Sequence, residues 1–239
     1  MQKLYIMSRI NYTVKDPPLT RKGLEIECHD LSQHLEKHVP LIQQVELIVT
    51  SPLKRTLQTT EAALDFLIKR GIPVIPLAEL QETTENPIDI GSPLAELKQA
   101  WPHYDWSKID PIFPSKEGIY KFSQDTLLQR GAMARKWLAN RHEKVIAVVS
   151  HASFLRIGLG NCKFANADFR IFELEETGDS AMKGPTMVEW ESTKAMGGGM
   201  GRSVVGFYGW EVHDFGYMPG NEGKTREGLE KMVLEAPLR

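Results

Sequence analysis

Short apolar runs alternate along this chain with longer amphipathic stretches. The runs have the length and β-branched content of strands, whereas the stretches repeat their apolar residues at helical spacing. The predicted strands are residues 3–7, 45–50, 73–77, 144–150 and 169–174. The predicted helices are residues 20–39, 52–69, 122–141 and 153–160. This alternation predicts an α/β fold, a three-layer α/β/α sandwich around a mostly parallel central sheet.

The second predicted strand runs directly into a helix that carries a cation in its first turn. Thr50 or Ser51 is expected to cap this helix, and Pro52 suits its first position. Arg55 then faces the positive end of the helix dipole, which costs about 0.3–1 kcal/mol on a plain surface. A bound anion would reverse that sign. The alternative is that Arg55 extends into solvent or pairs with a neighbour such as Glu61.

The same order of strand and helix recurs at 144–160. Its apolar run is continuous, as in a parallel strand covered on both faces. His151 comes just after the carboxyl end of this strand. Since ligands bind at the carboxyl ends of parallel strands, Arg55 and His151 are expected to converge on one pocket.

The helix predicted over 122–141 carries large apolar residues at helical spacing. We expect this stripe to face the core, with its tryptophan packed there rather than stacked on a ligand. The stripe consists of Leu127, Leu128, Met133, Trp137 and Leu138.

Four motifs, in this order, resemble the histidine phosphatase superfamily, also called phosphoglycerate mutase-like. The resemblance covers about residues 11–175, and its first motif is similar to the fungal-type members. The motifs are NYTVKDPPLTRKG (11–23), SPLKRTLQT (51–59), PLAELQE (76–82) and VVSHASFL (148–155).

The resemblance implies a phosphohistidine mechanism. In such enzymes a histidine at the end of the first strand attacks phosphorus, while two arginines and a second histidine bind the phosphoryl oxygens and a carboxylic acid protonates the leaving oxygen. Arg55 matches the second arginine, Glu82 the proton donor and His151 the second histidine. Glu79 and Glu85 are neighbouring carboxylates that an ordinary solvated loop explains.

The chain departs from the family at its first strand, where Arg-His-Gly or Arg-His-Ala is expected. The sequence there reads LYIMSRI, residues 4–10, and no histidine precedes His29. Two explanations stay open. A gene-model error, alternative splicing or a truncation has replaced the first strand, or the chain is a pseudoenzyme in which Arg9 supplies positive charge for phosphate.

The remaining histidines lack a supporting motif and are expected to be solvated or packed. They are His29, His34, His38, His103, His142 and His213. Ser150 beside His151 does not form a serine hydrolase site, because the chain has no Gly-x-Ser-x-Gly elbow.

Composition adds limits on partners and location. The chain has 239 residues, 41% hydrophobic and 25% charged, which are values of a globular domain. A net charge of −2 gives no broad attraction to nucleic acid or anionic membrane, so an anion site must be local. Two cysteines without metal spacing, and no nucleotide-binding motif, predict no metal or cofactor. We expect a cytoplasmic or nuclear protein; the oligomeric state is open.

The domain expectation is a phosphoglycerate mutase-like domain over 1–176 and an appended, partly flexible extension over 177–239. The extension contains a glycine-rich patch at 196–201. Within the domain, residues 83–120 are expected to form a lid, with plain surface loops as an equal alternative. The leading functional hypothesis is a hydrolase of a small phosphomonoester. A non-catalytic phosphate-binding or scaffolding module is the alternative, and a fungal biosynthetic accessory with non-phosphate chemistry is a third.

Overall fold

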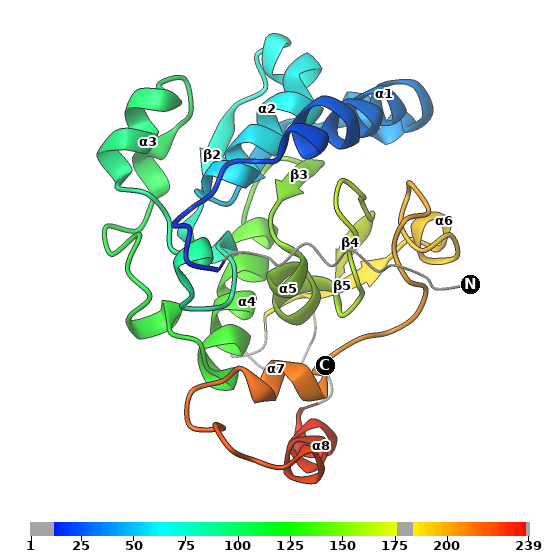
Figure 1. The fold of residues 1–239 in the computed structure, drawn as a ribbon. Helices are drawn as coiled ribbons and strands as arrows, with labels where there is room; N and C mark the ends of the chain where they lie inside the picture. The colour runs from blue at the N-terminus through cyan, green and yellow to red at the C-terminus, as the bar shows by residue number, and fades with distance from the viewer. Residues whose placement is uncertain (1–11, 176–183, 238–239) are drawn as a thin grey trace, which may run out of the picture.

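A three-stranded parallel sheet forms the centre of the molecule (Figure 1). The computed structural model describes residues 12–175 and 184–237. The strands are β1 (Leu47–Thr50), β2 (Val74–Pro76) and β3 (Ile146–Val149), in the order β2-β1-β3. The predicted α/β fold with a parallel sheet is confirmed, while the strand expected at 3–7 lies outside the described residues.

Alternate residues of β1 bury themselves in two different cores. Ile48 packs with α1 (Cys28–His38) and α2 (Lys54–Lys69) on one face of the sheet. Leu47 and Val49 pack on the other face with α4 (Gln124–Ala139) and with Phe154 of α5 (Ala152–Phe154). This arrangement, with helices on both faces of the sheet, is the predicted three-layer sandwich.

Several helix boundaries differ from the sequence prediction. A π-helical segment, Gly23–Glu27, precedes α1, and a second one, Leu155–Gly160, continues α5. The helix α2 begins at Lys54 rather than Pro52, and the carboxylate of the distant Asp16, not a residue next to the helix, accepts a hydrogen bond from the nitrogen of Lys54 at 2.9 Å. The predicted cap by Thr50 or Ser51 is therefore wrong. Short 3-10 turns lie at Pro40–Gln44 and Ala78–Leu80.

The buried stripe of α4 also differs from the predicted one. Met133 is 46% exposed, whereas Arg130 is fully buried between Leu127 and Ala134. The helix is rotated so that a guanidinium, rather than the thioether, faces the interior. Leu127 and Leu138 are buried as predicted.

Residues 83–120, the predicted lid, contribute several large side chains to the main core. They form α3 (Leu94–Ala100) and the 3-10 turns Pro87–Asp89, Trp106–Lys108 and Gly118–Tyr120. Their large side chains join the same hydrophobic cluster as α1 and α2. Those buried are Leu97, Trp101, Tyr104, Trp106, Ile109, Phe113 and Tyr120.

A second, two-stranded antiparallel sheet contains β4 (Phe172–Glu175) and β5 (Thr186–Glu189). The strand predicted over 169–174 thus begins three residues later and pairs with β5 rather than with the central sheet. The pairing joins residues on both sides of position 176. The division of the chain at that position stays a prediction.

The glycine-rich segment after α6 (Glu191–Lys194) is a hydrogen-bonded turn, although the sequence predicts flexibility there. Gly197 and Gly198 have positive φ and are buried. A side chain on Gly198 would collide with the Asp168 carboxylate, which accepts hydrogen bonds from the nitrogen of Met200 and the hydroxyl of Ser203. Close packing around Asp168 therefore explains these glycines.

The last helices, α7 (Val212–Gly216) and α8 (Arg226–Glu235), pack on the end of α4. A buried ion pair joins them to the domain, since Arg156 Nη2 lies 2.5 Å from Asp214 Oδ1. Trp210 and Phe215 share a cluster with Phe122 and Ile157. In the part of the chain that the structure describes, no helix has the length and apolar character needed to span a membrane.

Removing the Asp214 carboxylate should destabilise the whole fold. The side chains of Arg156 and Asp214 are only 6% and 7% exposed, so Asp214→Ala would leave a buried guanidinium whose remaining carboxylate, that of Glu211, is 4.0 Å away. We expect the free energy of unfolding in urea to fall by about 3–5 kcal/mol. Glu230→Ala, which breaks the exposed Arg226–Glu230 pair, is the control and should change little. Equal effects of the two substitutions would contradict this account.

Candidate active site

The register of the central sheet brings the predicted site residues to one edge. Thr50 is level with Pro76 of β2 and with Val149 of β3. The chain leaves these three strand ends toward Arg55, Glu82 and His151. All three side chains line one cavity of about 990 Å³, together with residues of α1, β3 and β4.

His151 is buried at the amino end of α5, with 6% of its surface exposed. Its Nε2 atom is hydrogen-bonded to the hydroxyl of Ser51, at 2.8 Å. Burial lowers the pKa of the imidazole well below its ordinary value, and the charges of Arg55, Lys116 and Arg130 lower that pKa further. The imidazole is therefore neutral at neutral pH, and Ser51 orients it instead of capping α2.

Arg55 is turned toward the loop after Glu82, not toward bulk solvent. Its Nη1 atom donates to the carbonyl of Ile88 at 2.7 Å, and its Nη2 atom donates to Asp89 Oδ1 at 2.9 Å. Glu61, the alternative partner, lies 3.4 Å from His103 instead. A guanidinium has five N–H donors, so Arg55 keeps donors beyond the two that these contacts use. The sequence did not predict that Asp89 pairs with Arg55.

Glu82 is the third predicted site residue that lines this cavity. Its Oε1 atom accepts hydrogen bonds from the backbone nitrogens of Thr83 at 2.8 Å and Phe154 at 3.2 Å. Burial, and then the charge of Asp89, raise the pKa of this carboxyl; the hydrogen bond from Thr83 and the charge of Arg55 oppose them. Glu82 therefore holds its proton to higher pH than an ordinary glutamic acid, as a proton donor requires.

The neighbouring carboxylates have different environments. Glu85 accepts a hydrogen bond from the backbone nitrogen of Phe122 at 3.0 Å. Glu79 is also buried enough that its pKa is raised. The described lining of the cavity includes Glu82 but neither Glu79 nor Glu85.

The sequence did not predict two cations near Glu82, Lys116 and Arg130. Lys116 Nζ donates to the carbonyl of Glu82 at 2.7 Å. Arg130 lies over the ring of Phe154, with its Cζ atom 4.5 Å from the ring centroid. A signal for Arg130 was available, because it stands at helical spacing between Leu127 and Ala134. Lys116 follows an irregular segment, where sequence periodicity does not indicate which way a side chain points.

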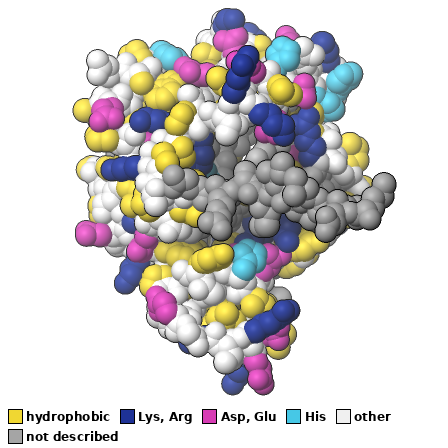
Figure 2. All heavy atoms as spheres, in the orientation of Figure 1, with side chains coloured by type: hydrophobic (Ala, Val, Ile, Leu, Met, Phe, Trp, Pro, Cys, Tyr) yellow, Lys and Arg dark blue, Asp and Glu magenta, His cyan; other side chains and the backbone are white. Residues whose placement is uncertain are grey.

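The positive charge is local to this site. The chain has a net charge of −2. On the face shown in Figure 2, Lys and Arg side chains are interspersed with Asp and Glu side chains. The molecule as a whole therefore gives no broad attraction to anions.

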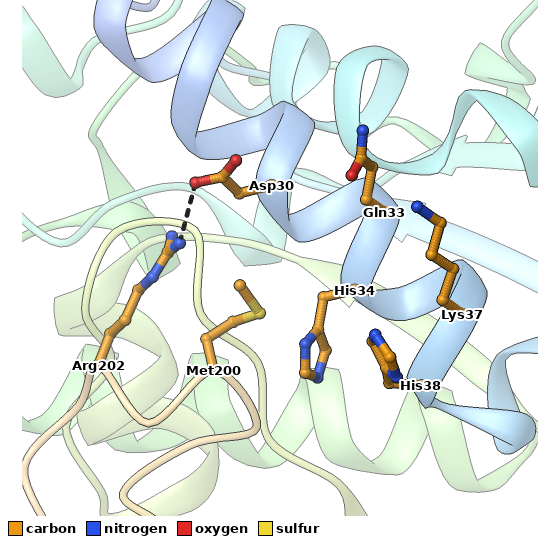
Figure 3. Close-up of a pocket in the computed structure, with 7 residues that line it drawn as sticks. All are labelled: Asp30, Gln33, His34, Lys37, His38, Met200 and Arg202. Carbon is orange, nitrogen blue, oxygen red and sulfur yellow. Dashed lines mark hydrogen bonds and ion pairs between the residues drawn. The ribbon is translucent and has the colours of Figure 1, made fainter.

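The other histidines lie away from the cavity. His34 and His38 project from successive turns of α1 at a surface hollow of about 310 Å³, which Met200 and Arg202 also line (Figure 3). The exposed rings of His142 and His213 lie 3.5 Å from the Glu143 carboxylate and 3.3 Å from the Glu211 carboxylate. Among the described residues, His151 alone contributes an imidazole to the cavity lining. Arg9 lies outside the described residues, so its predicted role in phosphate binding stays a prediction.

The described residues contain no recognisable group of metal ligands. Across residues 12–175 and 184–237, no group of three or more His, Cys, Asp or Glu side chains is arranged to hold a metal ion. Cys28 and Cys162 are buried, unpaired thiols.

Known proteins resemble this chain over much of its length. A probable phosphatase of Schizosaccharomyces pombe is 35% identical over 116 residues, which are 47% of this chain and 54% of that protein. A phosphoglycerate mutase-like protein of Arabidopsis thaliana is 28% identical over 170 residues, 59% of this chain and 61% of that protein. The chain thus spans between half and two thirds of the length of these relatives.

Solved structures and a family model complete the comparison. Bacillus stearothermophilus YhfR aligns with a TM-score of 0.46 and 19% identity, over 74% of this chain and 88% of its own. Mycobacterial hydrolase 1 aligns with a TM-score of 0.44 and 15% identity, over 75% of this chain and 89% of its own. The model of the histidine phosphatase superfamily, branch 1, matches residues 7–183. Since this match covers most of the chain, the protein belongs to the histidine phosphatase superfamily.

Proposed function

We propose that this protein is a histidine-phosphatase-type hydrolase that binds a small phosphomonoester at the carboxyl edge of its central sheet. One observation carries the proposal: Arg55, Glu82 and His151 line the same cavity. The S. pombe relative, named a probable phosphatase, supports the same chemistry. In this proposal residues 1–176 are the phosphoglycerate mutase-like domain that contains these three residues, and residues 177–239 are an appended, partly flexible extension.

The proposed roles follow from the geometry. Arg55 supplies fixed positive charge to the phosphoryl oxygens with the N–H donors that Asp89 and Ile88 leave unused. His151, held neutral by burial, donates a hydrogen bond to the same group. Glu82 retains its proton and gives it to the leaving oxygen. Water is the final acceptor of the phosphoryl group.

One observation favours a second candidate function, a non-catalytic phosphate-binding or scaffolding module. Attack on phosphorus requires a nucleophile aligned with the leaving oxygen. His151 Nε2 is hydrogen-bonded to Ser51, and the described residues contribute no other imidazole to the cavity. Both candidates share the anion site and differ in turnover.

Anion binding should depend on Arg55 and His151. We expect Arg55→Ala and His151→Ala each to weaken binding of inorganic phosphate about tenfold or more, since each removes a charged or buried hydrogen-bond donor. Calorimetric titration measures the dissociation constants. Arg21→Ala and His38→Ala change the same residue types on exposed positions of the first helical region and are the matched controls.

Release of phosphate from p-nitrophenyl phosphate by the same proteins separates the two candidate functions. Turnover that is lost in both variants supports the hydrolase. Phosphate binding without turnover supports the binding module. Phosphate affinity that is unchanged in Arg55→Ala and His151→Ala would reject both.

The role of Glu82 predicts a dependence on the leaving group. An alkyl oxygen needs a proton to leave, whereas nitrophenolate does not. Glu82→Gln should therefore lower hydrolysis of glycerol phosphate by about 10²–10⁴-fold and affect p-nitrophenyl phosphate much less. In the unmodified protein, alkyl hydrolysis should decline as pH rises through the raised pKa of Glu82, because the acid form is required. Glu85→Gln is the control, and an equal loss on both substrates would argue against Glu82 as the proton donor.

A further inference from the structure

Ser51 is a buried serine whose hydroxyl reaches the ring of His151. Its Oγ atom lies 2.8 Å from His151 Nε2, and none of its surface is exposed. His151 lines the cavity that also contains Arg55 and Glu82, whereas Ser51 is not among the described residues of that lining. Ser51 therefore supports the imidazole from behind and does not face a ligand in the cavity.

Hydrogen bonds from three neighbours fix the backbone of Ser51. Its nitrogen donates to the carbonyl of Val149 at 2.9 Å, which joins the end of β1 to the end of β3. Its carbonyl accepts from the hydroxyls of Thr56 at 2.9 Å and of Thr50 at 3.3 Å. Both threonines are buried. The Ser51 hydroxyl is thus presented to His151 by backbone that cannot shift without breaking these bonds.

The direction of the Ser51–His151 hydrogen bond follows from the number of protons available. A serine hydroxyl donates once, and among the described residues His151 Nε2 is its one hydrogen-bond partner. A buried hydroxyl that donates to no acceptor loses the hydrogen bond that it makes in water. The hydroxyl of Ser51 therefore donates, and Nε2 accepts.

The acceptor role of Nε2 decides where the ring proton lies. Burial, and then the charge of Arg55, hold the pKa of His151 well below its ordinary value, so the ring is neutral and carries one proton. The hydrogen bond made by one ring nitrogen determines the protonation of the other. With Nε2 accepting from Ser51, the proton is on Nδ1.

We propose that Ser51 is a positioning residue of the anion site: it holds His151 as the Nδ1–H tautomer, so that Nδ1 is the atom that donates to an anion beside Arg55. The inference rests on the proposed function, because it takes the anion site of Arg55 and His151 as given. Without the hydroxyl, Nε2 loses its donor. The ring can then rotate and carry its proton on either nitrogen, and its N–H points at the anion only part of the time.

Nitrogen-15 NMR of the His151 ring, assigned by its absence in His151→Ala, reads the tautomer directly. In the unmodified protein at neutral pH we expect a protonated Nδ1 and an unprotonated Nε2. Ser51→Ala should move the proton toward Nε2 and weaken binding of inorganic phosphate about tenfold. Ser51→Thr keeps the hydroxyl and should keep both the tautomer and the affinity.

Ser153→Ala is the matched control, because it removes a hydroxyl from α5 two residues after His151 and outside the described cavity lining. It should change neither the tautomer nor the affinity. Thermal unfolding of each variant checks the fold, and the tautomer of the unmodified protein tests the inference even where Ser51→Ala is unstable.

Two results would overturn the role of Ser51. One is a His151 ring that carries its proton on Nε2 in the unmodified protein. The other is a folded Ser51→Ala variant that keeps both the tautomer and the phosphate affinity. In either case the proposed function stands if Arg55→Ala still weakens phosphate binding. If the unmodified protein binds no phosphate, the proposed function fails and this inference fails with it.

Discussion

The parallel register of three short strands is the constraint on which the site depends. Thr50 is level with Pro76 on one side and with Val149 on the other, and the backbone nitrogen of Ser51 donates to Val149. The segments that follow the three strands therefore leave the sheet at one edge, and each of them carries a polar side chain. The Ser51–His151 hydrogen bond joins two of these exits directly. A shift of β3 along β1 would break this bond and would also displace His151 from Arg55. The geometry of the site therefore depends on the register of the sheet.

Burial at this edge determines the protonation states. In a region of low dielectric, charges act over longer distances and ionisation is disfavoured. His151 is consequently neutral, Glu82 keeps its proton to higher pH, and the pKa of Lys116 falls to about 7. Asp89 pairs with Arg55, whereas the Arg130 guanidinium has no hydrogen-bond partner among the described residues and feels the charges of Glu82 and Glu79 from further away. Such an arrangement is costly for an empty structural core and is reasonable for a site that receives a negatively charged group.

The sequence predicts the sheet and its main site residues for physical reasons. Continuous apolar runs identify β1 and β3, and the strand-end rule brings Arg55 and His151 together. Glu82 required the family resemblance, because Glu79 and Glu85 are equivalent to it in local sequence. Partners distant in the chain were not predictable: Asp89 reaches Arg55 across 34 residues, and Lys116 reaches Glu82 across the same separation. Local sequence also predicted Thr50 or Ser51 as a helix cap and Met133 as a core residue. Both predictions are wrong, because tertiary packing overrides these local preferences.

The central claim is that His151 is a buried, neutral imidazole inside an anion site. An NMR titration of its ring signals with pH, repeated with inorganic phosphate, tests this claim most directly. The account predicts that His151 titrates well below the ordinary pKa of histidine in the free protein, and that phosphate changes both its shifts and its pKa. The ring signals of His38, on the exposed end of α1, should not respond to phosphate. A His151 ring that titrates at the ordinary pKa of histidine, and that does not respond to phosphate, would contradict the account.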